Sequence, residues 1–247
     1  MRILYFRKNF AFRLIAWLLL LTMFITIGYL AMRDRYAETT LAPIYQGSDT
    51  KKEIALTVNV YWGEEYLPQM LKIMQANDIK ATFFIGGQWA EKYPELLKEI
   101  SYQGHEIGSH GYSHPHPDHL TKDGNLREIK KSESIITQIT GKPINLFAPP
   151  YGERGKAVLA ACEEANYQCI LWSVDTIDWQ RPAPEVITQR VTQKAHNGAI
   201  VLMHPTAPTV KALPEMIKEL KQNGYKFVKV SEMIQSTAEE QNPTAEK

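Results

Sequence analysis

From Glu53 onward, short apolar runs alternate with longer amphipathic segments, and this alternation limits the possible folds more than any other feature of the chain. An apolar run followed by a segment of helical periodicity predicts a β-strand and the helix that returns the chain to a parallel neighbour. The predicted strands are Ile54–Val60, Ala81–Ile85, Glu106–Ser109, Ile144–Ala148, Tyr167–Trp172, Ala199–Met203 and Lys226–Val228. Seven such units predict an α/β fold, an irregular seven-stranded (β/α) barrel rather than an open sheet.

The amphipathic segments predict the helices between these strands. Their expected positions are Glu64–Asn77, Pro94–Gln103, Asn125–Thr140, Gly155–Ala165, Pro184–Ala195 and Val210–Gln222. Pro94 suits the first turn of a helix, and Gly141 followed by Pro143 marks a helix end. The polar residues from Gln235 to Lys247 are expected to form a frayed tail.

The N-terminal region carries a second strong signal, an uncharged stretch from Leu14 to Met32 that is long enough to span a bilayer. The residues before it include four basic ones and no acidic one, which places the N-terminus in the cytoplasm by the positive-inside rule. A cleaved signal peptide is disfavoured because the stretch is long and lacks a small-x-small cleavage site. A buried core helix is disfavoured by the flanking charges. The sequence therefore predicts a single-pass signal anchor with the rest of the chain outside the cytoplasm.

These patterns divide the chain into four parts. Residues 1–32 form the cytoplasmic tip and transmembrane anchor, residues 33–52 a polar tether, residues 53–236 the barrel domain and residues 237–247 a polar tail. The net charge of +1 and the absence of a long basic run argue against nucleic acid as a partner. Cys162 and Cys169 are too few for a disulfide framework and are expected to be buried free thiols.

Polar and aromatic residues follow the ends of several predicted strands. Because the carboxyl ends of the strands in a (β/α) barrel meet on one face, we expect these residues to form a functional site there. They are Asn59 to Gly63, His110, His114, Pro149 to Gly152, Asp175, Asp178, Trp179 and His204. Two histidines four residues apart, His110 and His114, can direct both imidazoles at one divalent ion.

The order of these motifs resembles that of the NodB-homology polysaccharide deacetylases, carbohydrate esterase family 4, over about Glu53 to Ile234. The predicted anchor, the tether and the sequence Tyr61-Trp62-Gly63 are similar to the sporulation-type branch, which would place the domain at the cell envelope or the forespore. The resemblance implies an enzyme that removes N-acetyl groups from peptidoglycan or chitin-like sugars. In this family, a metal-bound water attacks the amide, an aspartate is the base and a histidine protonates the leaving amine.

Position by position, the resemblance implies a role for each matching residue. His110 and His114 match the metal-binding histidines, with zinc as the expected divalent ion; His204 matches the general acid, and Asp175 the carboxylate that holds it. The implied groove for an N-acetylated cell-wall glycan is lined by Pro150, Tyr151, Asp178, Trp179 and Trp62. The backbone amide of Tyr151 would face the oxyanion.

The first motif departs from the family pattern. The family reads T-F-D-D-G, with the first aspartate as base and the second as a metal ligand, whereas this chain has Thr57-Val58-Asn59-Val60. An asparagine cannot accept the proton and a valine cannot bind the metal. The arginine that orients the base in the family is Ala148 here. We therefore expect a weakened metal site and an activity that is reduced or lost.

Other residues of the chain could take over the roles of the missing base and metal ligand. Glu64 or Glu65 could act as the base, although carboxylates at a helix start are usually partners of its dipole. His116 or His119 could complete the metal shell, against the alternative of an exposed loop, and His105 is expected to make a polar contact near its strand. The alternative functions are a non-catalytic glycan-binding or scaffolding protein and, less favoured, a different metal-dependent hydrolase.

Overall fold

The computed structural model describes residues 10, 13, 15–24, 26 and 42–241, which belong to two compact units, Met1–Ala42 and Pro43–Lys247. In the first unit the described helical run covers residues 15–24, about half of the roughly 20 residues that a membrane span needs. No helix among the described residues is long and apolar enough to cross a bilayer. The predicted single-pass anchor over Leu14–Met32 is therefore wrong, and the predicted extracytoplasmic location falls with it. Residues 14, 25 and 27–32 of that stretch lie outside the described residues.

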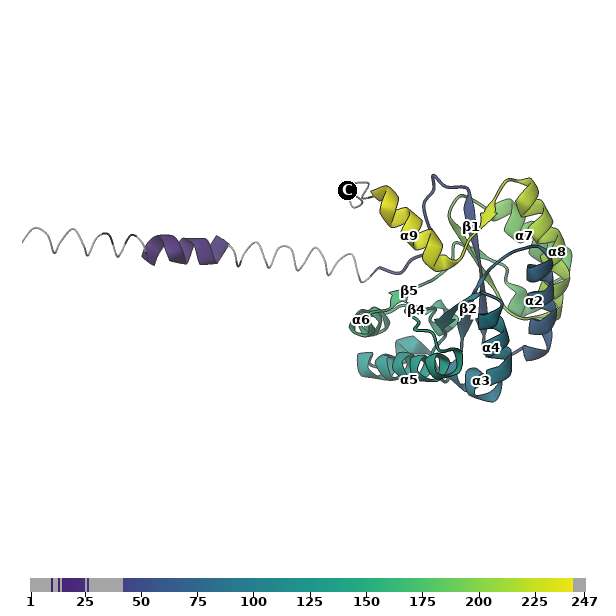
Figure 1. The fold of residues 1–247 in the computed structure, drawn as a ribbon, viewed down its shortest axis with the longest axis horizontal. Helices are drawn as coiled ribbons and strands as arrows, with labels where there is room; N and C mark the ends of the chain where they lie inside the picture. Colours follow the sequence, from purple (N-terminus) through teal and green to yellow (C-terminus); the bar gives the residue numbers. More distant parts are fainter. Residues whose placement is uncertain (1–9, 11–12, 14, 25, 27–41, 242–247) are drawn as a thin grey trace, which may run out of the picture. The chain divides into compact units, whose positions relative to one another are not determined.

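The second unit is built on a curled sheet of parallel strands with helices outside it, which confirms the predicted (β/α) barrel class (Figure 1). β1 (Glu53–Val60) is central and pairs with β2 (Thr82–Ile85) on one side and β7 (Ala199–Met203) on the other. The strand order is β5-β4-β3-β2-β1-β7-β6, and β8 pairs with the start of β1. The remaining bounds are β3 Glu106–Ser109, β4 Leu146–Phe147, β5 Gln168–Cys169, β6 Val174–Asp175 and β8 Lys226–Phe227.

Two details of the strand prediction are wrong. The predicted strand Tyr167–Trp172 shortens to β5, and the chain forms a further strand, β6, that was not predicted. The predicted last strand pairs only with Glu53 and Ile54, so β6 and not β8 continues the sheet beyond β7. Two-residue strands are too short to show a hydrophobic period, so only pairing with β7 reveals β6.

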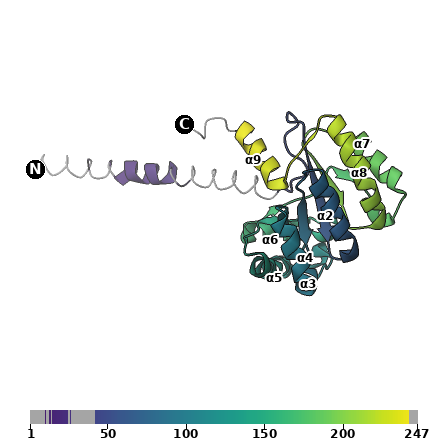
Figure 2. The ribbon, with the colours of Figure 1, turned by 45° about the vertical axis from the view of Figure 1, so that its right-hand side comes forward.

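Helices α2 to α8 cover the outer face of the sheet, whereas α9 lies apart from them and packs against β1 (Figures 1 and 2). Their bounds are α2 Leu67–Ala76, α3 Gly87–Lys92, α4 Pro94–Tyr102, α5 Lys122–Thr140, α6 Lys156–Ala165, α7 Pro184–Lys194, α8 Ala207–Gln222 and α9 Val230–Gln241. Pro94 opens α4 and Gly141 caps α5 with a φ of 70°, as predicted. α3 was not predicted, and α9 runs through residues that were expected to be a frayed tail.

β1 sets the direction of the side chains that matter for the site. Successive side chains of a strand point to opposite faces, so Ala55, Thr57 and Asn59 share one face and Ile54, Val58 and Val60 the other. Val60 belongs to the large apolar cluster between the sheet and the helices, and Ala55 to a smaller cluster inside the barrel. Asn59 therefore faces the barrel interior, whereas Val60 faces the helix layer.

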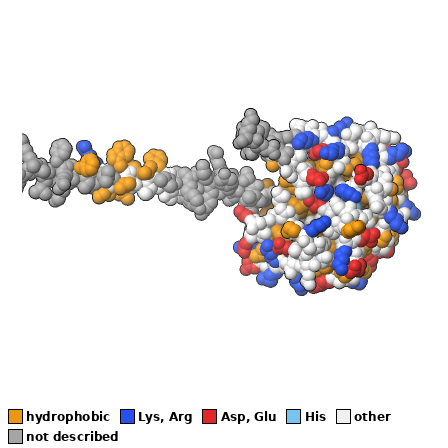
Figure 3. Space-filling model, viewed as in Figure 1, with side chains coloured by type: hydrophobic (Ala, Val, Ile, Leu, Met, Phe, Trp, Pro, Cys, Tyr) orange, Lys and Arg blue, Asp and Glu red, His pale blue; other side chains and the backbone are white. Residues whose placement is uncertain are grey.

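The start of the second unit joins the sheet before β1 begins. Ile44 forms a bridge with Ile170, and Gln46 forms one with Ala199. Residues 42–52 of the predicted tether thus include segments in contact with the barrel, and residues 33–41 lie outside the described residues. Both cysteines are buried free thiols, as predicted. Acidic and basic side chains are intermixed on the face that Figure 3 shows.

Candidate active site

A cavity of about 450 Å³ opens at the carboxyl ends of the strands, where the sequence predicted a site. Its lining residues are Asn59, Tyr61, Trp62, His110, His114, Tyr151, Gly152, Trp172, Asp175, Trp179, Leu202 and His204. Most predicted site residues are therefore brought together, whereas Pro150 and Asp178 are buried outside the lining. Sequence reasoning missed Trp172 and Leu202. Leu202 could have been found from the alternation along Ala199–Met203, which places it on the interior face.

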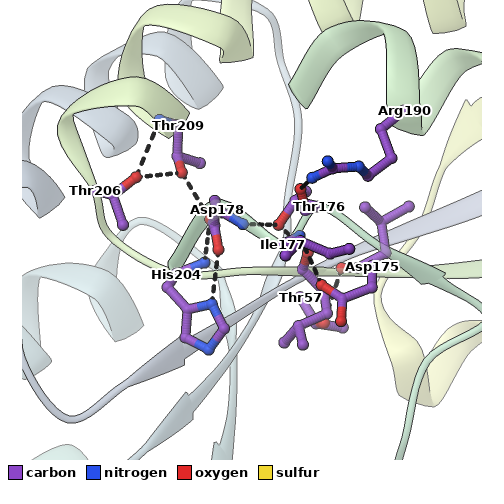
Figure 4. A network of polar contacts seen from close by, with 11 residues as sticks. Thr57, Asp175, Thr176, Ile177, Asp178, Arg190, His204, Thr206 and Thr209 are labelled. Atoms are coloured by element: carbon purple, nitrogen blue, oxygen red, sulfur yellow. Dashed lines mark hydrogen bonds and ion pairs between the residues drawn. The ribbon is translucent and has the colours of Figure 1, made fainter. Parts of the chain in front are cut away.

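His204 is held by a buried carboxylate, but that carboxylate is Asp178 and not Asp175 (Figure 4). His204 Nδ1 donates to Asp178 Oδ1 at 2.8 Å, and the His204 backbone N–H donates to Oδ2 at 2.7 Å. Asp175 Oδ1 instead accepts from the backbone N–H of Ile177 at 2.8 Å. The reason is that Ile177 adopts a left-handed backbone conformation, with a φ of 52°. This residue turns the chain after β6 and brings the Asp178 carboxylate within hydrogen-bonding distance of the His204 imidazole.

The first turn of α8 completes the surroundings of Asp178. The Thr209 hydroxyl donates to Asp178 Oδ2 at 2.6 Å, and the Thr206 side chain caps the helix by accepting from the Thr209 backbone N–H. A helix N-terminus stabilises a nearby carboxylate. With its side chain fully buried and three donors in place, Asp178 holds the His204 ring through Nδ1 and leaves Nε2 without a hydrogen-bond partner in the described chain.

Trp62 lies over the same histidine. Its ring is nearly parallel to that of His204, with an interplanar angle of 8° and a centroid distance of 5.7 Å. The turn that places it requires the next residue to be glycine. Gly63 has a φ of 80°, and a Cβ there would lie 2.2 Å from the Pro205 carbonyl oxygen.

On the opposite side of the cavity, His110 and His114 lie with their ring centroids 5.0 Å apart. His110 Nδ1 donates to the Ala148 carbonyl at 2.6 Å, and burial lowers the pKa of His110 to about 3. His110 is therefore neutral, with its Nε2 lone pair free. Burial also lowers the pKa of His114, whose ring stacks on Tyr61 at 4.7 Å and meets the edge of Tyr151 at 4.9 Å.

The loop between these histidines is fixed by a residue that the sequence did not suggest. Glu128, on α5, accepts from the backbone N–H groups of Tyr112 and Ser113 at 2.9 and 2.7 Å and from the Ser113 hydroxyl. A carboxylate in the middle of a helix carries no sequence signal for such a contact. The interaction follows only from the packing of α5 against the end of β3.

Comparison with known proteins identifies the family to which this fold belongs. The family model for polysaccharide deacetylase matches residues 46–170. The chain belongs to the polysaccharide deacetylase family.

Three relatives illustrate the range of this deacetylase family. The uncharacterized protein YlxY of Bacillus subtilis is 44% identical over 195 residues, which cover 79% of this chain and 61% of YlxY. A peptidoglycan-N-acetylglucosamine deacetylase of Bacillus cereus is 35% identical over 200 residues, covering 79% of this chain and 73% of the relative. A family 4 carbohydrate esterase pseudoenzyme from Bacillus anthracis is 43% identical, with a TM-score of 0.76 over 78% of this chain and 68% of that one. A mutant of this pseudoenzyme is described as having restored enzymatic activity.

The first motif of this chain departs from the family pattern in the structure as well as in the sequence. Asn59 lines the cavity with only 6% of its surface exposed, and its Oδ1 is buried without a hydrogen-bond partner. Val60 is fully buried in the outer apolar cluster and is not part of the cavity lining. The third metal ligand of the family pattern is therefore absent in both chemistry and position.

The remaining residues do not supply a complete metal site in this chain. His110 and His114 are two imidazoles where catalytic zinc sites have three protein ligands, and the described residues contain no group of three metal-binding side chains. His116 stacks on Tyr151 with a 4.0 Å centroid distance, and its Nδ1 lies 2.7 Å from Glu153 Oε1. The alternative that His116 or His119 completes the metal shell is therefore wrong.

The proposed substitute bases do not reach the site either. Glu64 accepts a hydrogen bond from the Tyr93 hydroxyl, and neither Glu64 nor Glu65 is among the described residues that line the cavity. His105 makes the expected contact near its strand, because its Nδ1 accepts from the Ala81 backbone N–H at 3.1 Å.

Proposed function

We propose that this chain is a glycan-binding pseudoenzyme of the polysaccharide deacetylase family. It holds an amino-sugar glycan of the peptidoglycan type, in which most units are N-acetylated, and it releases acetate far more slowly than active relatives. The observation that carries the proposal is the state of the first motif. Asn59 cannot accept a proton, and Val60 lies in the outer apolar core instead of the cavity. A positioned general base contributes about 10²–10⁴ in rate, which this chain would lose.

The groove that remains suits a sugar chain. Trp62, Tyr151 and Trp179 are 38%, 57% and 55% exposed at the rim of the cavity. Large aromatic side chains left in solvent around a concave site are typical of binding surfaces. In our proposal these rings form the walls for successive sugar units, and His204 stays in the cavity as a polar contact.

We further propose that His110 and His114 bind a divalent ion such as zinc weakly. The support is chemical, because neutral imidazole nitrogens are good zinc ligands and His110 Nε2 is free. Two protein ligands without an anionic one give less affinity than three. Zinc titration of the full chain and of His110→Ala tests this, with measurable binding expected only in the unchanged chain.

The main test combines activity with binding. We expect the full chain, with zinc present, to release no acetate from peptidoglycan above the level of His204→Ala. We also expect it to co-sediment with peptidoglycan, and Trp179→Ala to weaken this binding. Tyr102→Ala is the matched control, because Tyr102 is an exposed aromatic residue on α4, 92% exposed and away from the cavity.

Each result decides between the two candidate functions. Brisk acetate release that disappears in His204→Ala would mean that the chain is an active deacetylase. Failure of the full chain to sediment with peptidoglycan would remove the glycan-binding proposal.

A further inference from the structure

We infer that the cavity selects a free amine over an acetamido group, so that the glycan unit held there is one that has already been deacetylated. This inference rests on the proposed function, since it takes the groove to be a glycan site. Beyond that function, the inference specifies the acetylation state of the sugar at the cavity and the residues that recognise this state.

The first argument is that His110 and Asn59 offer hydrogen-bond acceptors that lack a partner. His110 Nδ1 donates to the Ala148 carbonyl, so the neutral His110 ring presents the lone pair of its Nε2. Asn59 adds a second acceptor, because it lines the cavity and its Oδ1 makes no hydrogen bond in the described chain. A buried polar atom without a partner destabilises the fold and therefore calls for an explanation. A donor on a ligand supplies one.

The second argument is charge. Asp175 lines the cavity, and within the described chain its only hydrogen bond runs from the Ile177 backbone N–H to Oδ1. Its Oδ2 accepts none of the hydrogen bonds found there. Among the described lining residues there is no lysine or arginine to neutralise it. The other carboxylate close by, Asp178, is already bound by His204 and Thr209. A cavity with one unneutralised carboxylate favours a cationic group.

The third argument is the aromatic lining. Five rings belong to the cavity wall, those of Tyr61, Trp62, Tyr151, Trp172 and Trp179. A cation near the face of tryptophan or tyrosine is attracted by the ring electrons, and cages of such rings are a recurring way to bind ammonium groups. The same rings stack on the sugar that carries the amine.

These features distinguish the two states of an amino sugar. A protonated amine offers three donors and no acceptor, which matches the acceptors of His110 and Asn59 and the charge of Asp175. An acetamido group offers one donor, and its carbonyl oxygen would face lone pairs. Such an amine arises in the glycan by amide hydrolysis, in which water cleaves the C–N bond and acetate leaves. The reaction class that must supply this ligand is therefore N-deacetylation by an active enzyme.

The experiment is a calorimetric titration of the full chain, in chelator, with three β-1,4-linked tetrasaccharides, of glucosamine, N-acetylglucosamine and glucose. We expect the glucosamine tetrasaccharide to bind at least about tenfold more tightly than the other two, the effect of one added charge-assisted contact. Equal binding of all three, or tighter binding of the acetylated one, would overturn the inference and leave the glycan-binding proposal standing. Binding of none would overturn both.

Variants locate the preference. Asp175→Asn removes the charge without changing the shape and should abolish the tenfold preference for the glucosamine tetrasaccharide. Asn59→Leu should reduce this preference without abolishing it. Asp123→Asn changes the net charge equally at an exposed position on α5 and should keep the preference. Loss of the preference in Asp123→Asn would show that it comes from the overall charge of the chain. Retention in Asp175→Asn would also contradict the inference. Zinc should compete with the glucosamine tetrasaccharide, because both cations use the same acceptors.

Discussion

The two sides of the cavity differ in how their polar groups are paired. On the side of His204, Asp178 is fully buried and accepts three hydrogen bonds, two from His204 and one from Thr209. On the side of β1, Asn59 is almost as buried and its Oδ1 accepts none. A satisfied buried network rigidifies its surroundings, whereas an unpaired buried polar group destabilises the fold. The comparison teaches that the His204 side is part of the stable fold and the β1 side is the part whose chemistry has changed.

The largest expected effect comes from restoring the base on the unpaired side. With zinc present, Asn59→Asp should raise acetate release from peptidoglycan by about 10²–10⁴, because the position faces the cavity. Val60→Asp is the matched substitution. It should give no activity and should destabilise the fold, since Val60 is fully buried among apolar side chains. A gain from Val60→Asp but not from Asn59→Asp would reverse our assignment of the two faces of β1.

The next effect measures the paired side. Asp178→Ala should lower the free energy of unfolding by about 3–5 kcal/mol, because His204 and Thr209 lose their shared acceptor. Urea denaturation gives the value. Asp175→Ala, at the less buried carboxylate, should lower it by about 1 kcal/mol or less. Equal losses would show that the network around Asp178 has no special weight in stability.

A pH effect follows from two buried histidines. Burial lowers the pKa of His110 to about 3 and that of His105 to about 4, against 6.5 in the unfolded chain. Between the folded-state and unfolded-state pKa values, the unfolded chain binds more protons than the folded chain. The contribution of these neutral histidines to the free energy of unfolding is therefore complete above about pH 6.5 and is lost as the pH falls. From pH 7 to pH 5 each histidine should lower the free energy of unfolding by about 2 kcal/mol.

Urea denaturation at both pH values, in the unchanged chain and in His105→Leu, checks this effect. The variant should lose the contribution of His105, about 2 kcal/mol of the pH-dependent difference, whatever its stability at pH 7. An unchanged pH dependence in the variant would show that His105 is not held neutral in the folded state.

The smallest expected effect is a gain. Asn59→Leu should raise the free energy of unfolding by about 1 kcal/mol, because it removes a buried acceptor that has no partner. Asn125→Leu is the control, since the Asn125 side chain donates to the Pro117 carbonyl at 3.0 Å and its replacement should destabilise the fold. Destabilisation by both substitutions would mean that Asn59 is paired in solution.

Much of the fold and of the site was predictable because local patterns suffice for them. The apolar period predicted β1, β3 and β7 almost to the residue. Residues that follow strand ends in a barrel must meet at one rim, so His110, His114, Tyr151, Trp179 and His204 were expected together and are found together. The departure from the family's first motif at Asn59 and Val60 was also predictable from the sequence, because residue type alone excludes a base and a metal ligand there.

What only the tertiary structure decided depends on contacts between segments far apart in the chain. The partner of His204 is Asp178 and not Asp175. The left-handed turn at Ile177 and the first turn of α8 together bring the Asp178 carboxylate within hydrogen-bonding distance of the imidazole. Glu128 holds the histidine loop because α5 packs beside β3. Sequence spacing fixes which face of a strand a residue occupies, but not which buried groups remain unpaired, since pairing is a property of three-dimensional neighbours. That is why the unpaired acceptor of Asn59, and the amine that we infer for it, became visible only in the folded chain.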